Sequence, residues 1–379
     1  MPAPFRFELL AQDPSSGLRA GVLHTPHGPI PTPSFMPVGT AATVKTLAPL
    51  DLRATGARCL LANTYHLVLR PGVDAVRRLG GLHAMMRWDG PVLADSGGFQ
   101  VFSLGGLRQV TEHGVWFRSH LDGTPAFLSP EGVIAAEEAL GADLIMPLDE
   151  CVGADASRAA TEAALARTQR WWRRSLAARS RDDQALFALV QGGLHADLRR
   201  EAARAAASEE VPGFAIGGFS IGEPEEVTAA LLAETLAHLP PERPRYLMGV
   251  GSPGEVLRYA RAGVDLFDSV LPTRLARNGA VWADPVTGGR LDLASRELLR
   301  ERGPMLRGCA CPACTGWPLG ALAALFQARE QLAYRLASAH NLTVLATALR
   351  TLREAVLRKG CYSAGARVVY TPEGDAHTC

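Results

Sequence analysis

The chain carries at residues 266–274 the stretch Leu266-Phe267-Asp268-Ser269-Val270-Leu271-Pro272-Thr273-Arg274. Its apolar residues predict a buried strand that delivers one carboxylate, Asp268, to a rim bearing Arg274 and Arg277. Asp268 is therefore a candidate nucleophile or base, and the two arginines are candidate contacts to a phosphate or a nucleobase. A buried ion pair between Asp268 and one arginine explains this stretch equally well.

Apolar runs of this kind recur along the chain and alternate with amphipathic stretches. The runs cover residues 33–39, 59–64, 91–95, 142–149, 185–190, 213–216, 246–250 and 264–270, and helical patterns cover about 157–180, 196–208, 224–238 and 254–262. Continuous apolar strands between helices indicate a parallel sheet covered on both faces. Eight such strands in residues 33–275 predict an α/β fold, a (β/α)8 TIM barrel, which takes about 250 residues.

We expect four segments around this barrel. Residues 1–32 carry turn signals typical of an N-terminal β-hairpin extension. Residues 33–299 form the catalytic barrel, 300–342 a C-terminal zinc-binding subdomain, and 343–379 a helix (343–359) that completes the barrel, followed by a tail that is disordered from 371.

Composition narrows the class of protein. The 379 residues are 47% hydrophobic and 20% charged, with a formal net charge of +1, which is typical of a globular protein. A nucleic-acid partner would therefore meet local basic patches, such as residues 290–360 with eleven Arg or Lys against five Asp or Glu. The absence of a signal-like N-terminus and of long apolar runs predicts a cytoplasmic protein without a membrane segment.

Polar residues collect where the predicted strands end. They are Asn63, Asp95, Asp149, Gln191, Gly218, Met248 and Asp268. The carboxyl ends of the strands hold the active site in this fold. A single Asp at such a position is more often a helix N-cap or a turn residue. Several carboxylates, an amide and glycine pairs on one rim instead favour a site where backbone approaches a flat ligand closely.

Two carboxylates that face one substrate permit double displacement at an anomeric carbon. One attacks and the other manages the proton, as in retaining glycoside chemistry, and we select Asp268 and Asp95 for these roles. Asp149 and Gln191 can read a planar heterocycle, because a carboxylate accepts N–H bonds and an amide both donates and accepts.

Three of the seven cysteines are clustered, at Cys309, Cys311 and Cys314, and His340 follows. Three thiolates and an imidazole form a closed tetrahedral set for one structural zinc ion (Zn²⁺), with no open position for catalysis. His340 could instead be an ordinary helix-face histidine, since it shares a stripe of i+4 spacing with Leu332 and Leu336.

The motifs together closely resemble those of the bacterial tRNA-guanine transglycosylases over nearly the whole chain. The matching segments are Ala94-Asp95-Ser96-Gly97-Gly98-Phe99-Gln100-Val101-Phe102-Ser103-Leu104, Asp149-Glu150-Cys151, Val190-Gln191-Gly192, Ile216-Gly217-Gly218, Tyr246-Leu247-Met248-Gly249-Val250-Gly251 and Phe267 to Arg274. The family has the same Cys3His arrangement, and it forms homodimers.

The resemblance implies exchange of the wobble guanine of GUN-anticodon tRNAs for preQ1 (7-aminomethyl-7-deazaguanine) in queuosine biosynthesis. Asp268 would be the nucleophile that forms a covalent Asp–ribose intermediate, and Asp95 the general acid/base. The base would be held by Ser96, Gly97, Gly98, Phe99, Asp149, Gln191, Gly218 and Met248, with Phe99 and Met248 sandwiching it. The anticodon loop would lie along Gly249, Val250, Gly251, Ser252, Pro253, Gly254, Glu255, Thr273, Arg274, Leu275, Ala276 and Arg277.

The chain departs from the family pattern in places. Val152-Gly153-Ala154-Asp155 replaces a common Thr-Pro-Tyr-Pro, Phe219 a usual Leu, and Ser252 a common Lys that would contact phosphate. Ile221 stands where eukaryotic relatives have a smaller residue, which favours preQ1 over bulky queuine.

Two other functions remain open from the residues. One is a tRNA-binding relative without chemistry, which the retention of Asp95 and Asp268 disfavours. The other is an unrelated barrel hydrolase that uses Asp149 and Asp268 with a catalytic zinc. Metal removal distinguishes a catalytic zinc from a structural one. Loss of a catalytic zinc lowers the rate of the folded protein at once, whereas loss of a structural zinc acts only through unfolding.

Overall fold

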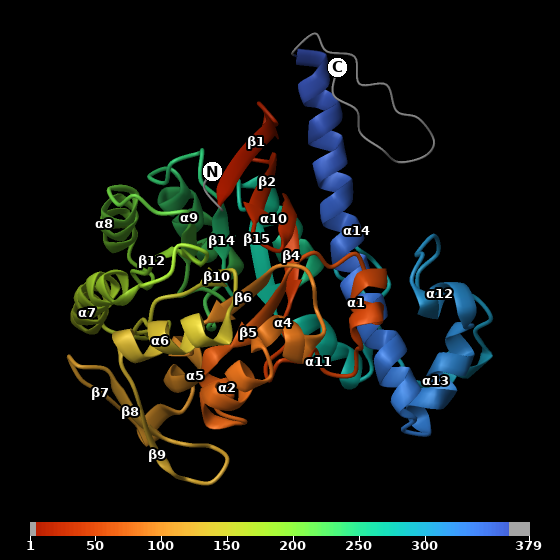
Figure 1. Cartoon of the computed structure of the whole chain (residues 1–379). Helices are drawn as coiled ribbons and strands as arrows, with labels where there is room; N and C mark the ends of the chain where they lie inside the picture. The colour runs from red at the N-terminus through yellow and green to blue at the C-terminus, as the bar shows by residue number, and fades with distance from the viewer. Residues whose placement is uncertain (1–4, 364–379) are drawn as a thin grey trace.

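Eight parallel strands close into a barrel in the structure, a computed structural model that describes residues 5–363 (Figure 1). In chain order they are β4 (Ser34–Pro37), β5 (Leu60–Asn63), β6 (Val92–Asp95), β10 (Leu144–Ile145), β11 (Ala185–Leu186) continued by β12 (Ala188–Val190), β13 (Phe214–Ile216), β14 (Arg245–Leu247) and β15 (Leu266–Ser269). Each pairs in parallel with its neighbours, and a bridge from Val38 to Leu61 joins β4 to β5. The predicted (β/α)8 barrel is confirmed.

The strands are apolar throughout because both of their faces are buried. Leu266 packs inside the barrel with residues such as Leu93 and Leu144, while the next residue, Phe267, packs outward against the helices. Successive side chains of a strand point to opposite faces, so a strand with helices on one side and a filled interior on the other has no solvent-facing position.

Helices cover the outer face of the barrel. The larger ones are α6 (Pro130–Leu140), α7 (Arg158–Ala178), α8 (Ala196–Ala207), α9 (Glu225–Leu236) and α10 (Pro253–Arg261). Shorter ones are α1 (Pro49–Ala54), α2 (Thr64–Leu69), α3 (Val73–Arg78), α4 (Gly81–Met86), α5 (Gly98–Phe102) and α11 (Leu271–Arg277). Ser157 begins α7 by accepting a bond from the Ala160 N–H, which satisfies a free donor of the first turn. The four helical patterns of the sequence are confirmed.

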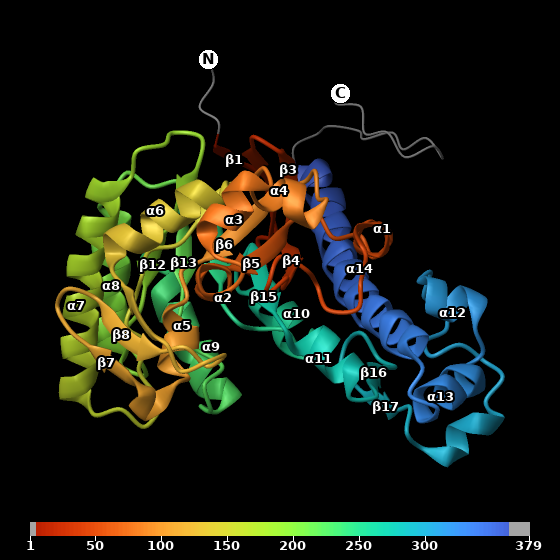
Figure 2. The same ribbon diagram turned by 60° about the horizontal axis from the view of Figure 1, so that its bottom comes forward.

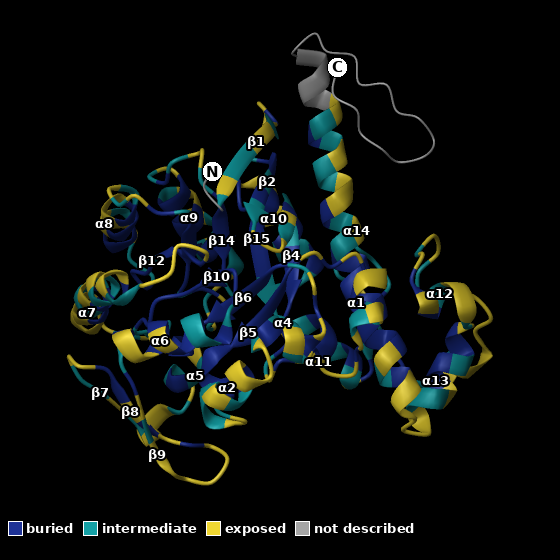
Figure 3. Cartoon of the chain, in the orientation of Figure 1, coloured by how far each residue is buried: buried dark blue, intermediate teal, exposed yellow. Residues whose placement is uncertain are grey.

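An N-terminal antiparallel sheet closes the amino end of the barrel. It contains β1 (Arg6–Gln12), β2 (Arg19–Thr25) and β3 (Gly28–Thr32), in that order. Leu23 and Ile30 are fully buried in the interior cluster. Arg19 forms a buried ion pair with Asp265, 2.8 Å long, just before β15. The buried interior is continuous from this sheet through the strands (Figure 3).

Two small sheets were not predicted. One inserts between β6 and α6 and contains β7 (Arg108–Val110), β8 (Val115–Arg118) and β9 (Pro125–Leu128). The other pairs β16 (Ala280–Trp282) with β17 (Arg290–Asp292). Their strands have only three or four residues, too few for a period of two to stand out from loop sequence.

The C-terminal region is organised by one long helix, α14 (Gln331–Ser363), which runs between the barrel and the short elements η2 (Arg296–Arg300), α12 (Pro312–Gly316) and α13 (Leu319–Gln327) (Figure 2). It begins earlier than the helix expected from residue 343 and passes through the expected boundary at 342, because residues 331–359 contain no proline or glycine. The expected disordered tail from 371 lies outside the described residues. Within the described part, no helix has the length and apolar character that crossing a membrane requires.

Candidate active site and metal centre

Asp268 is the penultimate residue of β15 and lies at the carboxyl mouth of the barrel. Its Oδ1 accepts hydrogen bonds from the Tyr246 hydroxyl (2.7 Å) and the Gly249 N–H (2.8 Å). Among the described residues no arginine pairs with Asp268 or contributes to its pKa, which excludes the ion-pair alternative. Burial raises the pKa of Asp268 to about 6, against the opposing effect of these two hydrogen bonds. Oδ2 has no protein partner in the described chain and is the oxygen available to a ligand.

Asp95 ends β6 and enters the same mouth. The Asn63 side-chain amide of the neighbouring strand donates to its Oδ2 at 2.8 Å. Burial raises the pKa of Asp95, while hydrogen bonds from Asn63, Gln100 and two backbone N–H groups act in the opposite direction. The charge of Asp95 in turn raises the pKa of Asp268 and of Asp149, which places the three carboxyl groups within electrostatic reach of one another.

Asp149 and Gln191 form the second polar pair of the mouth. The Gln191 Nε2 donates to Asp149 Oδ2 at 2.6 Å, and the Cys151 thiol donates to the same oxygen at 3.2 Å. Burial raises the pKa of Asp149 to about 6. No role of Cys151 was predicted from the sequence, and its position two residues after Asp149 is the signal that could have indicated one.

Glycines let the backbone lie directly against this pair. A Cβ on Gly98 would lie 2.1 Å from Asp149 Oδ1, and a Cβ on Gly218 would lie 2.5 Å from Gln191 Oε1. Gly218 also has a φ of 74°, a backbone angle that residues other than glycine rarely adopt. Ser96 is buried beside them, and its hydroxyl accepts from the Gly98 N–H at 3.4 Å. The backbone of Gly98 and Gly218 therefore lies directly against the polar groups of Asp149 and Gln191.

Two apolar side chains stand at this mouth. The Phe99 side chain is 48% exposed, so its ring is accessible from solvent. Met248 is half-buried against the barrel interior. Their pairing around a base stays a prediction.

Arg199 is a buried residue whose role was not predicted from the sequence. Its guanidinium donates to the carbonyls of Gly193 (2.7 Å), Gly217 (3.2 Å) and Gly218 (3.1 Å), and it stacks on the Phe219 ring at 3.6 Å. It therefore ties together the two loops that carry Gln191 and Gly218. Phe219, one of the departures, faces this arginine. Arg199 lies on a helix with exposed arginines around it, so the sequence alone does not single it out.

The basic rim lies beside Asp268. A cavity of about 190 Å³ is lined by Val38, Thr40, Lys45, Val270, Thr273, Arg274 and Arg277. Burial and the neighbouring Arg274 lower the pKa of Arg277, and its Nη1 has no hydrogen-bond partner. Lys45 and Thr40 were not predicted. An unpaired, partly buried guanidinium beside a second cation is a suitable anion contact.

The other expected RNA contacts differ in what they can offer. Val250, Pro253 and Ala276 are buried, so that a ligand would reach only their backbone or none of their atoms. Gly251 packs against Ser269, and the Ser252 hydroxyl bonds Glu255 within the first turn of α10. The residues that present side chains to solvent are thus mainly the arginines.

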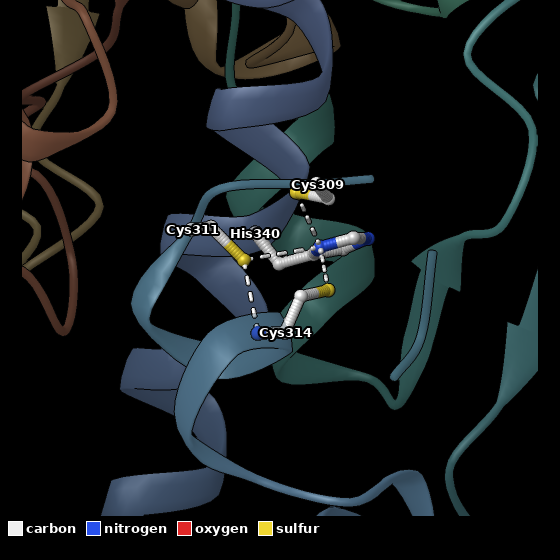
Figure 4. A group of neighbouring side chains, drawn as sticks. All are labelled: Cys309, Cys311, Cys314 and His340. Atoms are coloured by element: carbon white, nitrogen blue, oxygen red, sulfur yellow. Dashed lines mark hydrogen bonds between the residues drawn. The ribbon is translucent and has the colours of Figure 1, made fainter. Parts of the chain in front are cut away.

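The four expected metal ligands converge on one point (Figure 4). The Sγ atoms of Cys309, Cys311 and Cys314 lie 3.7, 3.4 and 3.3 Å from His340 Nδ1. Zn–S and Zn–N bonds at tetrahedral angles place such atoms about 3.5 Å apart. His340 Nε2 lies 2.8 Å from the Trp282 carbonyl oxygen, so that Nε2 carries the proton and Nδ1 is free to bind a metal.

The metal site joins distant parts of the chain. His340 is fully buried in the middle of α14, while the cysteines precede or begin α12. A helix-face histidine without a further role would not meet three sulfur atoms, so that alternative is excluded. The donor set is compatible with a metal ion and leaves no position open.

A family model described as Queuine tRNA-ribosyltransferase matches residues 13–369. The chain belongs to this family. The Queuine tRNA-ribosyltransferase of Herpetosiphon aurantiacus is 51% identical over 340 residues, which cover 90% of this chain and 86% of that protein. The protein of the same name from Thermosynechococcus vestitus is 52% identical over 341 residues, 90% of this chain and 89% of that one. A third protein of this name, from Symbiobacterium thermophilum, is 50% identical over 352 residues, which cover 93% of this chain and 87% of that protein.

Membership of the queuine tRNA-ribosyltransferase family confirms the resemblance seen in the motifs and agrees with the barrel. The roles of individual residues remain predictions, as do the expected domain boundaries. What the structure adds is their arrangement: the two candidate catalytic carboxylates and the pair that would read a base share one mouth.

Proposed function

We propose that the protein is a tRNA-guanine transglycosylase that exchanges the wobble guanine of GUN-anticodon tRNAs for preQ1. The observation that carries the proposal is the convergence of Asp268 and Asp95 at one barrel mouth, where the charge of Asp95 raises the pKa of Asp268. Asp268 keeps one oxygen unpartnered, and Asp149 with Gln191 presents a polar edge beside it.

The first half of the exchange breaks the glycosidic bond. Asp268 Oδ2 attacks the ribose anomeric carbon, and the bond from that carbon to the base breaks with its electron pair moving to the base. Asp95 donates a proton to the departing guanine. Its raised pKa suits this role, because a carboxyl group in a buried site retains a proton at higher pH than one in water.

The second half reverses these steps with a new base. Asp95, now ionised, removes a proton from the incoming base, the base attacks the anomeric carbon, and Asp268 leaves as a carboxylate. The RNA strand is never cut, since only the bond at the anomeric carbon changes. Asp95 thus acts first as the acid and then as the base, while Asp268 is the nucleophile and then the leaving group, as in retaining glycosidases.

Asp149 and Gln191 would read the edge of the base. A carboxylate accepts N–H bonds of a guanine-like edge, and the Gly218 N–H would meet its carbonyl. Ile221, half-buried on the following loop, supports the smaller preQ1 over queuine. The base must leave its stack to enter this slot, which costs a few kcal/mol and is least costly in a loop.

Zinc and RNA binding complete the proposal. One structural zinc ion would hold residues 300–342 on α14 through Cys309, Cys311, Cys314 and His340 and supply no chemistry. Arg274 and Arg277 would contact the anticodon loop beside Asp268. We also propose a homodimer, which light scattering of the full chain would test against a monomer.

Incorporation of labelled guanine into an anticodon stem-loop tests the function. Wild type should incorporate label, Asp268→Asn should lose activity by orders of magnitude, and Asp182→Asn, which changes an exposed carboxylate far from the site, should retain it. In addition, denaturing gels should trap an RNA–protein adduct with wild type but not with Asp268→Asn. No incorporation by wild type would reject the enzyme, and equal incorporation by Asp268→Asn would reject the nucleophile.

A further inference from the structure

We propose a second metal site, for a divalent transition-metal ion, formed by His27, His83 and Asp143. His27 lies in the turn between β2 and β3, His83 in α4, and Asp143 directly before β10. These residues stand at the amino ends of the barrel strands, where β3 and α4 lie together (Figure 2), and so at the opposite end from Asp268 and Asp95. They share no residue with the cysteine cluster.

Four donor atoms face one another in this cluster. His27 Nδ1 lies 2.8 Å from Asp143 Oδ1, and His83 Nε2 lies 3.2 Å from Asp143 Oδ2. The ligand atoms of the three residues all lie within 4.8 Å of one another. Neighbouring ligand atoms around an ion with bonds of about 2.1 Å are roughly 3 Å apart at octahedral angles and about 3.4 Å apart at tetrahedral ones. An ion between the two nitrogens and the carboxylate would therefore need only small side-chain shifts.

The carboxylate is held ready for such a role. Asp143 is 1% exposed, and its Oδ2 accepts the Val92 N–H at 2.9 Å while its Oδ1 accepts the His27 N–H at 3.3 Å. Each oxygen therefore uses one lone pair on the backbone and keeps another for the imidazoles or an ion. Backbone bonds of this kind fix the orientation of ligating carboxylates in metal sites.

The two imidazole rings pack against each other and direct one nitrogen each toward the carboxylate. Their rings stack with centroids 3.6 Å apart and an angle of 19° between planes. His27 Nδ1 and His83 Nε2 are the ring nitrogens that face the Asp143 carboxylate, and they are the atoms that would bind the ion. The remaining nitrogens, His27 Nε2 and His83 Nδ1, have no hydrogen bond to the described residues, so each can take up the proton that the ligating nitrogen gives up.

Ligand chemistry and exposure define the kind of ion. Two imidazoles and a carboxylate suit Zn²⁺, Co²⁺ or Ni²⁺ better than Mg²⁺ or Ca²⁺, which prefer oxygen. The His27 side chain is 43% exposed, so an ion could enter from solvent and keep water in its open positions. Because the ligands come from three segments, a bound ion would link the N-terminal sheet to α4 and to the barrel.

Metal stoichiometry and spectroscopy of the full chain test the site. After removal and readdition of metal, wild type should bind two Co²⁺ per chain. One should show the strong thiolate charge-transfer absorption of the cysteine site, and the other only weak nitrogen and oxygen bands. His27→Ala and His83→Ala should each bind one Co²⁺, with the thiolate band unchanged. His113→Ala, which removes an exposed histidine elsewhere, should still bind two.

Thermal stability provides an independent readout. Added Zn²⁺ beyond the first equivalent should raise the melting temperature of wild type and of His113→Ala but not of His27→Ala. His27 lies in an exposed turn, so this variant keeps the proposal testable if His83→Ala fails to fold. Binding of one Co²⁺ by wild type, or of two by His27→Ala, would overturn the proposal.

Discussion

Replacement of Tyr246 by phenylalanine should make the reaction more sensitive to acid. Tyr246 is fully buried, and burial followed by the charge of Asp268 raises its pKa well above the usual range, so the phenol stays protonated and donates to Asp268 Oδ1. This bond stabilises the ionised form of Asp268, which is the form that attacks. Tyr246→Phe removes one oxygen atom and leaves the ring in place.

The size of the effect follows from the hydrogen bond. A bond to a charged acceptor contributes about 1.5–3 kcal/mol, and a tenfold change in ionisation corresponds to about 1.4 kcal/mol. The Gly249 N–H remains bonded to the same oxygen, so we take the lower end: the acidic limb of the profile should move up by about one pH unit. Near pH 6, the pKa of Asp268 in the wild type, the ionised fraction falls from about a half to about a tenth.

The assay is kcat/KM for guanine exchange as a function of pH, which reports the ionisation of the free enzyme. Near pH 6 the variant should be slower by about fivefold, and roughly two pH units higher the two rates should agree within about twofold. Tyr259→Phe, which removes a hydroxyl from a buried tyrosine of α10, is the matched control and should leave the profile unchanged. Superimposable profiles for wild type and Tyr246→Phe would refute the reasoning, as would a loss of rate that is equal at every pH.

Three further predictions concern base binding, RNA binding and the metal. Gly98→Ala should weaken base binding and lower activity in the exchange assay by more than about tenfold, because the added Cβ would displace the Asp149 carboxylate. Gly106→Ala is the control: Gly106 has open space around it, so this variant should match wild type in the same assay. Arg277→Ala should weaken binding of the anticodon stem-loop and reduce the slope of log K against log salt by about 0.7; an unchanged slope would exclude the contact. Cys314→Ser should abolish the thiolate absorption band of the Co²⁺-substituted protein and lower the melting temperature, with activity falling only as the protein unfolds. An immediate loss of rate in folded protein would point to a catalytic metal instead.

Much of the barrel could be predicted from the sequence, because a strand that is buried on both faces is a continuous run of apolar residues. Leu266 and Phe267 are adjacent, yet one faces the interior and the other the helices, so the run is apolar without alternation. Short, half-exposed strands such as β7 and β16 carry no comparable pattern. The start of α14 was also placed too late, since local sequence between residues 331 and 343 does not separate a helix start from a helix interior.

The residue types and order along the chain determined the strands, the rim on which Asp95, Asp149 and Asp268 stand, and the cysteine cluster. Tertiary structure alone decided which partners these groups meet. Asp268 accepts hydrogen bonds from Tyr246 and Gly249 and pairs with no arginine of the described chain. Arg199 donates hydrogen bonds to the carbonyls of two glycine-containing loops and so links them. The reason is physical: strand periodicity is a local property of the sequence, whereas a hydrogen bond or a raised pKa depends on distances between residues far apart in the chain.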